Sequence, residues 1–272
     1  MSPSARVHPS AQVDPGAVLA PDVVVGPFCV VGAGVRIGAG TVLHAHVVIE
    51  GPTTMGEQNR LFPFACIGME PQDLKFRGEP TTLEIGDRNL FRESVTVHRG
   101  TVGGGGVTRL GSDNLLMAGT HVAHDCHVGS HVIFANAATL AGHVTVEDGA
   151  TIGAFSGVHQ FCRVGIYGFL GGYTVATKDV LPYSKTVGNR ARIYGVNTLG
   201  LQRRGFSADV IAAIRQAYRV LLQSRLNTSE ALARLEAEPM IPEVRVLVEF
   251  IRTARRGVVL RRASRHHVTD EA

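Results

Sequence analysis

The chain has 272 residues, of which 44% are hydrophobic, and a formal net charge of +4. It contains no apolar run long enough to span a membrane, and its polar start leads us to expect no signal peptide. The four cysteines form no Cys-x-x-Cys pair, which favours reduced thiols and a cytoplasmic location.

Every sixth residue is apolar over most of the chain. One run extends from Val7 to Ile67 and a second from Leu110 to Leu170, and each has eleven members without a miss. A strict period of six is the hexapeptide signature of a parallel β-helix, in which three hexads form one coil and residues 18 apart stack. Coils stack at strand spacing, roughly 4.7–4.9 Å. The residue after each apolar one is usually small, and we expect glycine there both because it accepts positive φ and because a side chain would clash.

Two segments interrupt the repeat. Residues 69–82 are polar and contain prolines, and because Ile67 and Ile85 are 18 residues apart, this loop is expected to replace one coil without a shift of register. Residues 101–108 contain four consecutive glycines, and the register slips by one residue there. A glycine run can hold a phosphate, but no lysine or strand-to-helix context follows, which favours a plain flexible loop. Excursions from a repeat often form its binding face.

Beyond Pro182 the period of six fails, and a helical pattern begins near Ser207. Ser207 is a suitable N-cap, a second helix is expected near Thr228, and a third from Pro242 to Gly257. The sequence thus predicts a mainly β protein, with a hexapeptide-repeat β-helix over residues 1–190 and a C-terminal α-helical domain over residues 191–272. The pattern does not determine the hand of the coil, although parallel crossovers in general favour the right hand.

Positive charge is concentrated at the helical end. Residues 203–272 hold 13 arginines and 8 acidic residues, whereas residues 1–202 hold 14 basic and 15 acidic residues. This is either an ordinary solvated surface or a docking surface for an acidic macromolecule. Aromatic residues are scarce there, so nucleic acid is not expected as a partner.

One polar cluster in the second run has the composition of a catalytic site. Stacking by 18 residues places His124, Gly142 and Gln160 in one column, and Asp125 below His143 in the neighbouring column. Histidine is the usual general base near neutral pH, an adjacent carboxylate holds its tautomer, and a glycine N–H can stabilise an oxyanion. The column therefore has the groups needed to deprotonate a hydroxyl and direct its attack on a thioester.

Two other interpretations of these histidines stay open. Histidines at coil corners can simply bond to the backbone, or three of them can bind zinc between subunits. His121, His124 and His127 occupy one strand and corner of one coil, so they cannot converge on a metal within one chain. We therefore expect no metal.

Several longer motifs lie between residues 60 and 207. They are IGMEPQDLK at 67–75, TVHRG at 96–100, GSDNLLM at 111–117, HVAHDC at 121–126, LAGH at 140–143, VHQF at 158–161, GVN at 195–197 and GLQRRGFS at 200–207. Together they closely resemble the acyl-carrier-protein–UDP-N-acetylglucosamine O-acyltransferases of lipid A biosynthesis, the LpxA family. The resemblance implies a left-handed coil, homotrimers with sites between subunits, no cofactor, and an acidic acyl carrier protein as the partner of the basic end.

The resemblance also implies a role for each matching residue. His124 is the general base on the glucosamine 3-hydroxyl, with Asp125 as its partner and the Gly142 N–H as oxyanion donor. The residues implied to surround the sugar and acyl chain are Asp73, Lys75, His121, His143 and Gln160. The residues implied to hold the UDP portion are Asn197, Arg203 and Arg204, and arginine suits a diphosphate by its planar fork. Gly172 lies where the family sets acyl length, and a glycine there leaves the groove open to a longer chain.

The implied reaction transfers a 3-hydroxyacyl group from the phosphopantetheine thioester of acyl carrier protein to the 3-hydroxyl of UDP-N-acetylglucosamine, the first step of lipid A biosynthesis. One alternative is the related N-acyltransferase, whose additional N-terminal domain finds no room before hexads that begin at Val7. A second alternative is a non-catalytic structural β-helix. One departure from the family pattern is Leu199, which stands where a family member has an acidic residue and so bears on how nucleotide is held.

Overall fold

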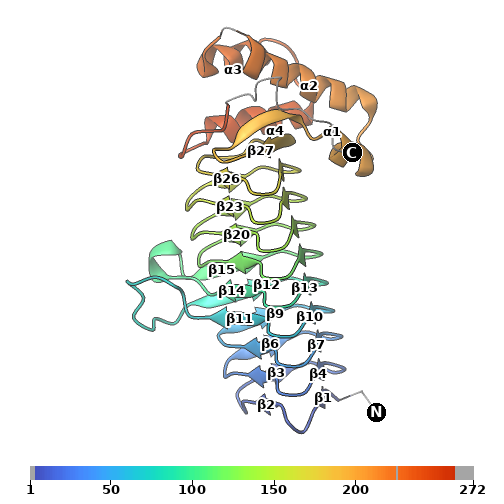
Figure 1. Cartoon of the computed structure of the whole chain (residues 1–272), viewed down its shortest axis with the longest axis vertical. Coiled ribbons are helices and arrows are strands. Elements are labelled where there is room, and N and C mark those ends of the chain that lie inside the picture. Colours follow the sequence, from blue (N-terminus) through green and yellow to red (C-terminus); the bar gives the residue numbers. More distant parts are fainter. Residues whose placement is uncertain (1–3, 225, 261–272) are drawn as a thin grey trace.

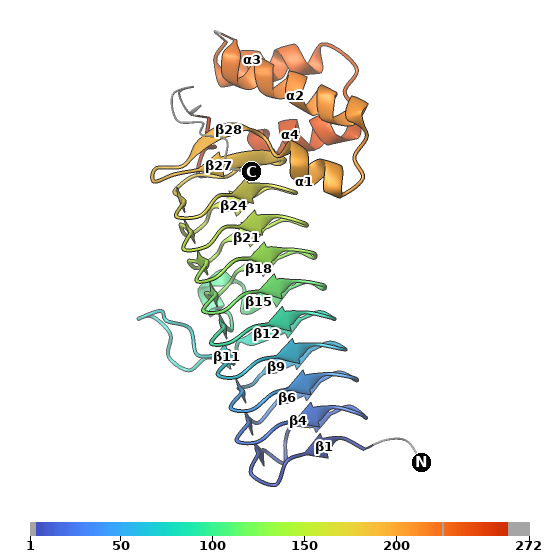
Figure 2. The same cartoon turned by 45° about the vertical axis from the view of Figure 1, so that its right-hand side comes forward.

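The computed structural model describes residues 4–224 and 226–260, and these form a long three-sided prism capped by helices (Figures 1 and 2). Each coil contributes one short strand to each of three sheets. Sheet A contains, in stacking order, β1 (Arg6–Val7), β4 (Val24–Val25), β7 (Val42–Leu43), β10 (Arg60–Leu61), β13 (Leu90–Phe91), β16 (Leu115–Leu116), β19 (Ile133–Phe134), β22 (Thr151–Ile152), β25 (Phe169–Leu170), β27 (Ser184–Val187) and β28 (Arg192–Val196).

Sheet B contains β2 (Gln12–Val13), β5 (Val30–Val31), β8 (Val48–Ile49), β11 (Cys66–Met69), β14 (Thr96–His98), β17 (His121–Val122), β20 (Thr139–Leu140), β23 (Gly157–Val158) and β26 (Val175–Ala176). Sheet C contains β3 (Val18–Leu19), β6 (Val35–Ile37), β9 (Thr53–Met55), β12 (Thr82–Ile85), β15 (Val107–Leu110), β18 (His127–Val128), β21 (Thr145–Val146) and β24 (Arg163–Val164). We name the three turns of each coil the AB, BC and CA corners after the sheets they join.

The predicted stacking is confirmed. Val7 pairs with Val25, and Leu140 pairs with Val158, each 18 residues further on in a parallel ladder. The hexad residues from Val25 to Leu170 are buried in one continuous core, while Val7 is 43% exposed at the open first coil. Each coil therefore buries its apolar side chains against the coils above and below it.

The expected reason for small residues after the apolar ones is only half right. A Cβ on Gly38 would lie 2.5 Å from the backbone of Gly56, so space does require glycine there. Positive φ, however, occurs two residues later in the hexad, as at Asp125 (φ 59°) and His143 (φ 61°). Seventeen described non-glycine residues adopt it. The left-handed turn is thus a property of the repeat, and it is held by the ladders on both sides of the turn rather than by residue preference.

The loop of residues 69–82 does not replace a coil, contrary to the expectation. Met55 of β9 pairs directly with Ile85 of β12, and β11 and β12 belong to the same coil. The loop is therefore an insertion at the BC corner, and it projects from the prism beside β11 (Figure 1). Residues 101–106, which include a short 3₁₀ helix at Val102–Gly104, are a second insertion at the same corner one coil later, since Ile85 pairs with Leu110.

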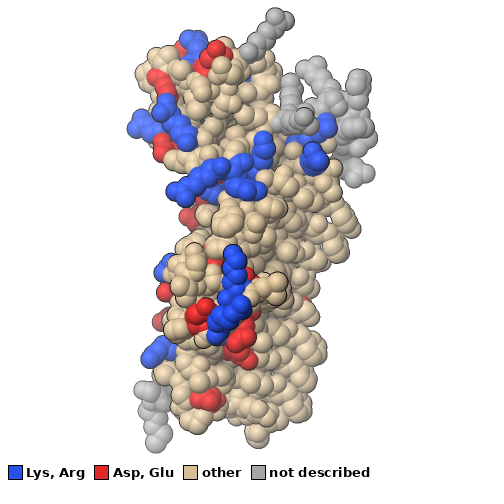
Figure 3. All heavy atoms as spheres, turned by 90° about the vertical axis from the view of Figure 1, so that its left-hand side faces the viewer, with Lys and Arg blue, Asp and Glu red and all other residues tan. Residues whose placement is uncertain are grey.

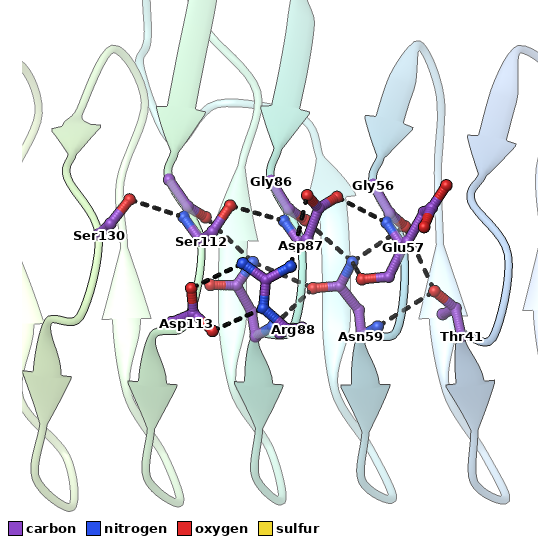
Figure 4. Close-up of polar contacts among 12 residues, drawn as sticks. Thr41, Gly56, Glu57, Asn59, Gly86, Asp87, Arg88, Ser112, Asp113 and Ser130 are labelled. Atoms are coloured by element: carbon purple, nitrogen blue, oxygen red, sulfur yellow. Dashed lines mark hydrogen bonds and ion pairs between the residues drawn. The ribbon is translucent and has the colours of Figure 1, made fainter.

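A column of buried polar side chains at the CA corner restores the stacking after both insertions (Figure 4). Asn59 Oδ1 accepts hydrogen bonds from the backbone N–H and the side-chain Nδ2 of Asn89, at 2.9 and 3.0 Å. Asn89 Oδ1 in turn accepts from the N–H of Asn114, at 3.0 Å. Thr41 begins the column by accepting from the N–H of Asn59. These four side chains are at most 1% exposed, so their bonds form in an environment where an unmade bond is costly.

The helical region caps the last coil. β27 and β28 form the antiparallel pair, and four helices follow: α1 (Thr198–Arg203), α2 (Ala208–Gln223), α3 (Thr228–Glu236) and α4 (Pro242–Arg252). The predicted N-cap is confirmed, since Ser207 accepts from the N–H of Val210. Gly257 was expected to end the last helix, but α4 ends at Arg252. The basic tail after Leu260 lies outside the described residues. Within the described part, no helix is long and apolar enough to cross a membrane.

Candidate active site

Both insertions and the predicted catalytic residues lie at the BC corner. His124 and Asp125 follow β17, and Gly142 and His143 follow β20 one coil higher. The N–H of His143 donates to the carbonyl of His124 at 3.0 Å, which fixes the two corners on top of each other. The sequence-predicted column of His124 and Gly142 therefore exists in space.

His124 and Asp125 form the closest polar pair at this corner. The Nδ1 of His124 lies 2.7 Å from Oδ2 of Asp125, whose side chain is fully buried. A carboxylate at this distance holds the proton on Nδ1 and leaves Nε2 as a lone-pair acceptor. The imidazole is 14% exposed, so Nε2 is accessible to a substrate hydroxyl. This is the arrangement of a general base.

The Asp125 carboxylate is held by the second insertion. Thr101 donates from its N–H to Oδ1 at 2.8 Å and from its hydroxyl to Oδ2 at 2.6 Å. The N–H of Asp125 donates to Oγ1 of Thr108 at 2.8 Å. Burial raises the pKa of the Asp125 carboxyl, but the bonds from His124 and Thr101 outweigh burial and lower the pKa overall. Asp125 is thus kept ionised beside the imidazole.

The second insertion is therefore not the plain flexible loop expected from its glycines. A Cβ on Gly104 would lie 2.0 Å from Cγ of Asp125, so the loop closes over this carboxylate and only glycine fits. By contrast, a Cβ on Gly103 would meet nothing within 4 Å. The four glycines thus serve different purposes, and one of them covers the site.

Gly142 has the properties that an oxyanion donor needs. Within the described chain its N–H has no hydrogen-bond acceptor, and its missing side chain leaves room for the imidazole. A Cβ there would lie 2.6 Å from Cε1 of His124. Gln160 occupies the same position one coil higher, since the N–H of Phe161 donates to the carbonyl of Gly142 at 3.3 Å, and its side chain is exposed. His124, the free N–H of Gly142 and Gln160 therefore lie on successive coils at the BC corner.

His143 and the long loop that carries Asp73 lie next to the His124–Asp125 pair at the BC corner. His143 Nε2 lies 3.7 Å from Oδ2 of Asp125, and its ring stacks on Phe161 at 4.4 Å between centroids. Burial is the main cause that lowers the pKa of His143, while Asp125 and Asp73 oppose it. Asp73 belongs to the long loop, which is inserted at the same corner. Lys75, from the same loop, is exposed, and its N–H donates to Oδ1 of Asp73.

His121 faces outward from sheet B below this corner. Its Nδ1 lies 2.7 Å from Oγ1 of Thr96, and its ring meets that of His98 edge-on at 4.9 Å. Burial lowers the pKa of both rings, in His98 to about 4. His98 is 5% exposed and its Nδ1 has no partner within the described chain. Both imidazoles are therefore neutral at pH 7.

The remaining predicted residues lie at other corners of the same chain. Arg204 lies at the CA corner, where it donates to the carbonyl of Gly149 at 2.9 Å and stacks over Tyr167. Asn197 caps α1 and donates to the carbonyl of Tyr167. Gly172 is exposed at the AB corner.

Arg203 is exposed near the end of α1, and Leu199, the departure from the family pattern, is 57% exposed on the same helix. One chain therefore does not bring the expected nucleotide-binding and chain-length residues to His124.

The donor set at the corner is largely engaged in hydrogen bonds within the protein. Ligand atoms of His124, Asp125 and His143 lie within 4.8 Å of one another. The Asp125 carboxylate, however, already accepts bonds from His124 and twice from Thr101, which use three of its roughly four lone-pair sites, and His124 Nδ1 is committed to the first of these bonds. His127 is exposed on the outer face of sheet C, apart from this corner. The geometry thus favours proton transfer over metal binding.

Sequence reasoning missed three residues of this site: Thr101, Gly104 and His98. The position of Thr101 follows from the length of an insertion, which the hexad pattern does not contain. The slip of one residue between Val97 and Leu110 was the available signal, because it marks a loop that must return to the same coil.

A hexapeptide-repeat β-helix that carries a histidine–carboxylate pair and a bare glycine at one corner defines an acyltransferase of the hexapeptide class. Comparison with known proteins agrees. A profile of bacterial transferase hexapeptide repeats matches residues 4–39 and 16–51, and the profile of the second domain of UDP-N-acetylglucosamine O-acyltransferase matches residues 179–259.

Solved structures narrow the class to one family. LpxA from Acinetobacter baumannii is 45% identical with a TM-score of 0.91, and the alignment covers 93% of this chain and 99% of that one. LpxA from Bacteroides fragilis is 43% identical with the same TM-score and coverage. UDP-N-acetylglucosamine acyltransferase from Arabidopsis is 34% identical with a TM-score of 0.82 and the same coverage.

The chain belongs to the LpxA family of UDP-N-acetylglucosamine O-acyltransferases, and it is an acyltransferase with the left-handed parallel β-helix of that family. The matched profile and these solved structures belong to UDP-N-acetylglucosamine O-acyltransferases, which favours that activity over the N-acyltransferase and over a non-catalytic β-helix.

Proposed function

We propose that the protein transfers a 3-hydroxyacyl group from acyl carrier protein to the 3-hydroxyl of UDP-N-acetylglucosamine, as the first step of lipid A biosynthesis. The observation that carries the proposal is the juxtaposition of His124, Asp125 and Gly142 at one corner, in a chain whose solved relatives are UDP-N-acetylglucosamine acyltransferases. The reaction needs a base, an oxyanion donor and two bound substrates. It requires no cofactor.

In this mechanism Nε2 of His124 takes the proton of the sugar 3-hydroxyl while the oxygen attacks the thioester carbonyl. Asp125 stabilises the imidazolium that forms. The negative charge on the carbonyl oxygen of the tetrahedral intermediate is met by the N–H of Gly142. Collapse of the intermediate forms the ester and breaks the carbon–sulfur bond, and the leaving thiolate takes the proton from His124. Protons and charge balance, and the imidazole is regenerated.

The remaining ligand contacts follow from the positions of the predicted residues. Asp73, Lys75, His121, His143 and Gln160 lie at or near the BC corner and would line the sugar and acyl chain. Asn197, Arg203 and Arg204 would hold the UDP portion, and Gly172 would leave the groove open to a longer acyl chain. Since these last four lie at other corners, a complete site requires a neighbouring chain. This supports a homotrimer in which the BC corner of one subunit faces another subunit.

The cysteine usage and the substrates support a cytoplasmic location for this reaction. Cys29, Cys66, Cys126 and Cys162 are all free thiols. Burial raises the pKa of the Cys126 thiol to about 12, which makes it an inert part of the core.

The test is turnover with acylated carrier protein and several UDP-hexosamines, with products identified by mass. His124→Ala is expected to reduce kcat by about 10²–10⁴, the usual contribution of a general base. The matched control is His127→Ala, an exposed histidine three residues away on sheet C that should leave turnover unchanged. Retention of more than about a tenth of activity by a folded His124→Ala protein would contradict the assignment of the base.

A further inference from the structure

The column that holds His124, Gly142 and Gln160 continues upward to a lysine. Val158 pairs with Ala176 in sheet B, so Lys178 stands above Gln160 as Gln160 stands above Gly142. Lys178 is exposed, and it closes the column where the prism meets the helical region. A cation therefore lies on the same edge of the molecule as the catalytic histidine, three coils away.

Two arginines from other parts of the chain lie beside Lys178. A Cβ on Gly257 would lie 3.9 Å from Nζ of Lys178, which places the ammonium group next to the residue that follows Arg256. Arg256 Nη2 lies 3.2 Å from Nδ1 of His159, the neighbour of Gln160. Arg190 and Lys178 both line a hollow of about 300 Å³. Three cations from separate segments thus gather at the top of the column.

These cations are not neutralised by acids. None of Lys178, Arg190 and Arg256 takes part in an ion pair among residues 4–224 and 226–260. The nearest carboxylate in sequence, Asp179, is 1% exposed and bound to Arg163 at 2.9 Å. Basic side chains also gather on this face of the molecule, below the helical region and above the loop excursions (Figure 3). Exposed cations without acidic partners are suited to an anionic ligand.

We propose that Lys178 and Arg256, with Arg190 beside them, bind the phosphodiester of the phosphopantetheine arm of the acyl donor. This inference rests on the proposed function, because it needs a thioester at Gly142. Two coils separate Gly142 from Lys178, which is about 10 Å at strand spacing. An extended arm between phosphorus and sulfur has the length of four to five extended residues, roughly 15 Å. The arm therefore reaches from one point to the other with some slack.

The same arrangement explains why the donor's phosphate would be bound far from the reacting thioester. The pantetheine chain between phosphate and sulfur is flexible and largely neutral, so it provides few strong contacts of its own. A phosphate held at a set height on the column restricts where the sulfur can lie. The thioester carbonyl is then delivered beside the Gly142 N–H, and less ordering is left for the chemical step.

The experiment compares two short donors that differ only in the phosphate, 3-hydroxyacyl-phosphopantetheine and 3-hydroxyacyl-pantetheine, at saturating UDP-N-acetylglucosamine. We expect the unmodified protein to prefer the phosphorylated donor in kcat/KM by about tenfold, with added salt reducing the preference. The double variant Lys178→Ala/Arg256→Ala should lose this preference and keep its kcat/KM for the donor without phosphate. Lys185→Ala, an exposed lysine on β27, is the matched control and should change neither value.

Two outcomes overturn the inference while the proposed function stands. One is equal use of both donors by a protein that turns over acylated carrier protein. The other is a variant that raises the KM for UDP-N-acetylglucosamine instead, which would assign the cations to the diphosphate of the nucleotide. A complete absence of turnover with every donor would refute the proposed function, and the inference would fall with it.

Discussion

Replacing Thr101 by valine removes one hydroxyl from the site at almost constant volume. That hydroxyl lies 2.6 Å from a carboxylate oxygen of Asp125, and both side chains are buried. A hydrogen bond to a charged group contributes about 1.5–3 kcal/mol, so Thr101→Val should lower the free energy of unfolding by that amount. The carboxylate also becomes less well held beside His124. Since about 1.4 kcal/mol corresponds to a factor of ten in rate, kcat/KM should fall by roughly 10- to 100-fold.

The pH dependence of kcat/KM gives the sharper assay for Thr101→Val. The bond from Thr101 is one of the causes that lower the pKa of Asp125, so its loss raises that pKa. Activity needs the ionised carboxylate, and the acid limb of the profile should therefore move to higher pH. The control is Thr120→Val, a buried threonine whose hydroxyl donates to the neutral carbonyl of Met117. It should cost about 1 kcal/mol and leave the profile unchanged. The reasoning is refuted if both variants lose the same stability and neither moves the profile.

Three further predictions follow from contacts described above. Gly142→Ala should reduce kcat/KM by about a hundredfold because its Cβ would displace His124, whereas Gly157→Ala, with nothing within 4 Å, should be neutral in the same assay. Burial lowers the pKa of His98 to about 4, so between about pH 6.5 and 4 the unfolded chain binds a proton that the folded chain does not. The free energy of unfolding should therefore fall as the pH falls through that window, and it should fall less in His98→Phe. Urea denaturation of both proteins at pH 7 and pH 5 measures the difference. Asn89→Ala should cost about 2–4 kcal/mol in the same measurement, because it leaves buried backbone groups without partners, and a loss below about 1 kcal/mol would contradict the role of the column.

The prism could be predicted because its core repeats. A period of six places Val25, Val31 and Ile37 on three successive sides, and the same rule predicts which residues stack one coil apart. The column of His124 and Gly142 follows from this rule without any knowledge of the side chains. Helix positions near Ser207 and Pro242 could likewise be predicted from local capping chemistry.

The parts that could not be predicted depend on non-repeating segments. The partner of Asp125 is Thr101, and their contact depends on the path of a glycine-rich insertion rather than on any period. The same is true of Asn59 and Asn89, whose separation in sequence includes the whole long loop. The location of Arg204 at another corner depends on how α1 packs against the last coils, which involves tertiary contacts absent from local sequence.

The column of Thr41 and the asparagines joins successive coils at the CA corner, whereas the insertions lie at the BC corner. The CA corner thus keeps neighbouring coils in register, and the BC corner accepts insertions of different length without a change in the stacking of the coils. A chimera that exchanges residues 70–81, between β11 and β12, for a loop of another length should therefore keep its coils in register. New binding loops can be grafted at the BC corner while the rest of the prism holds them at fixed spacings along its axis.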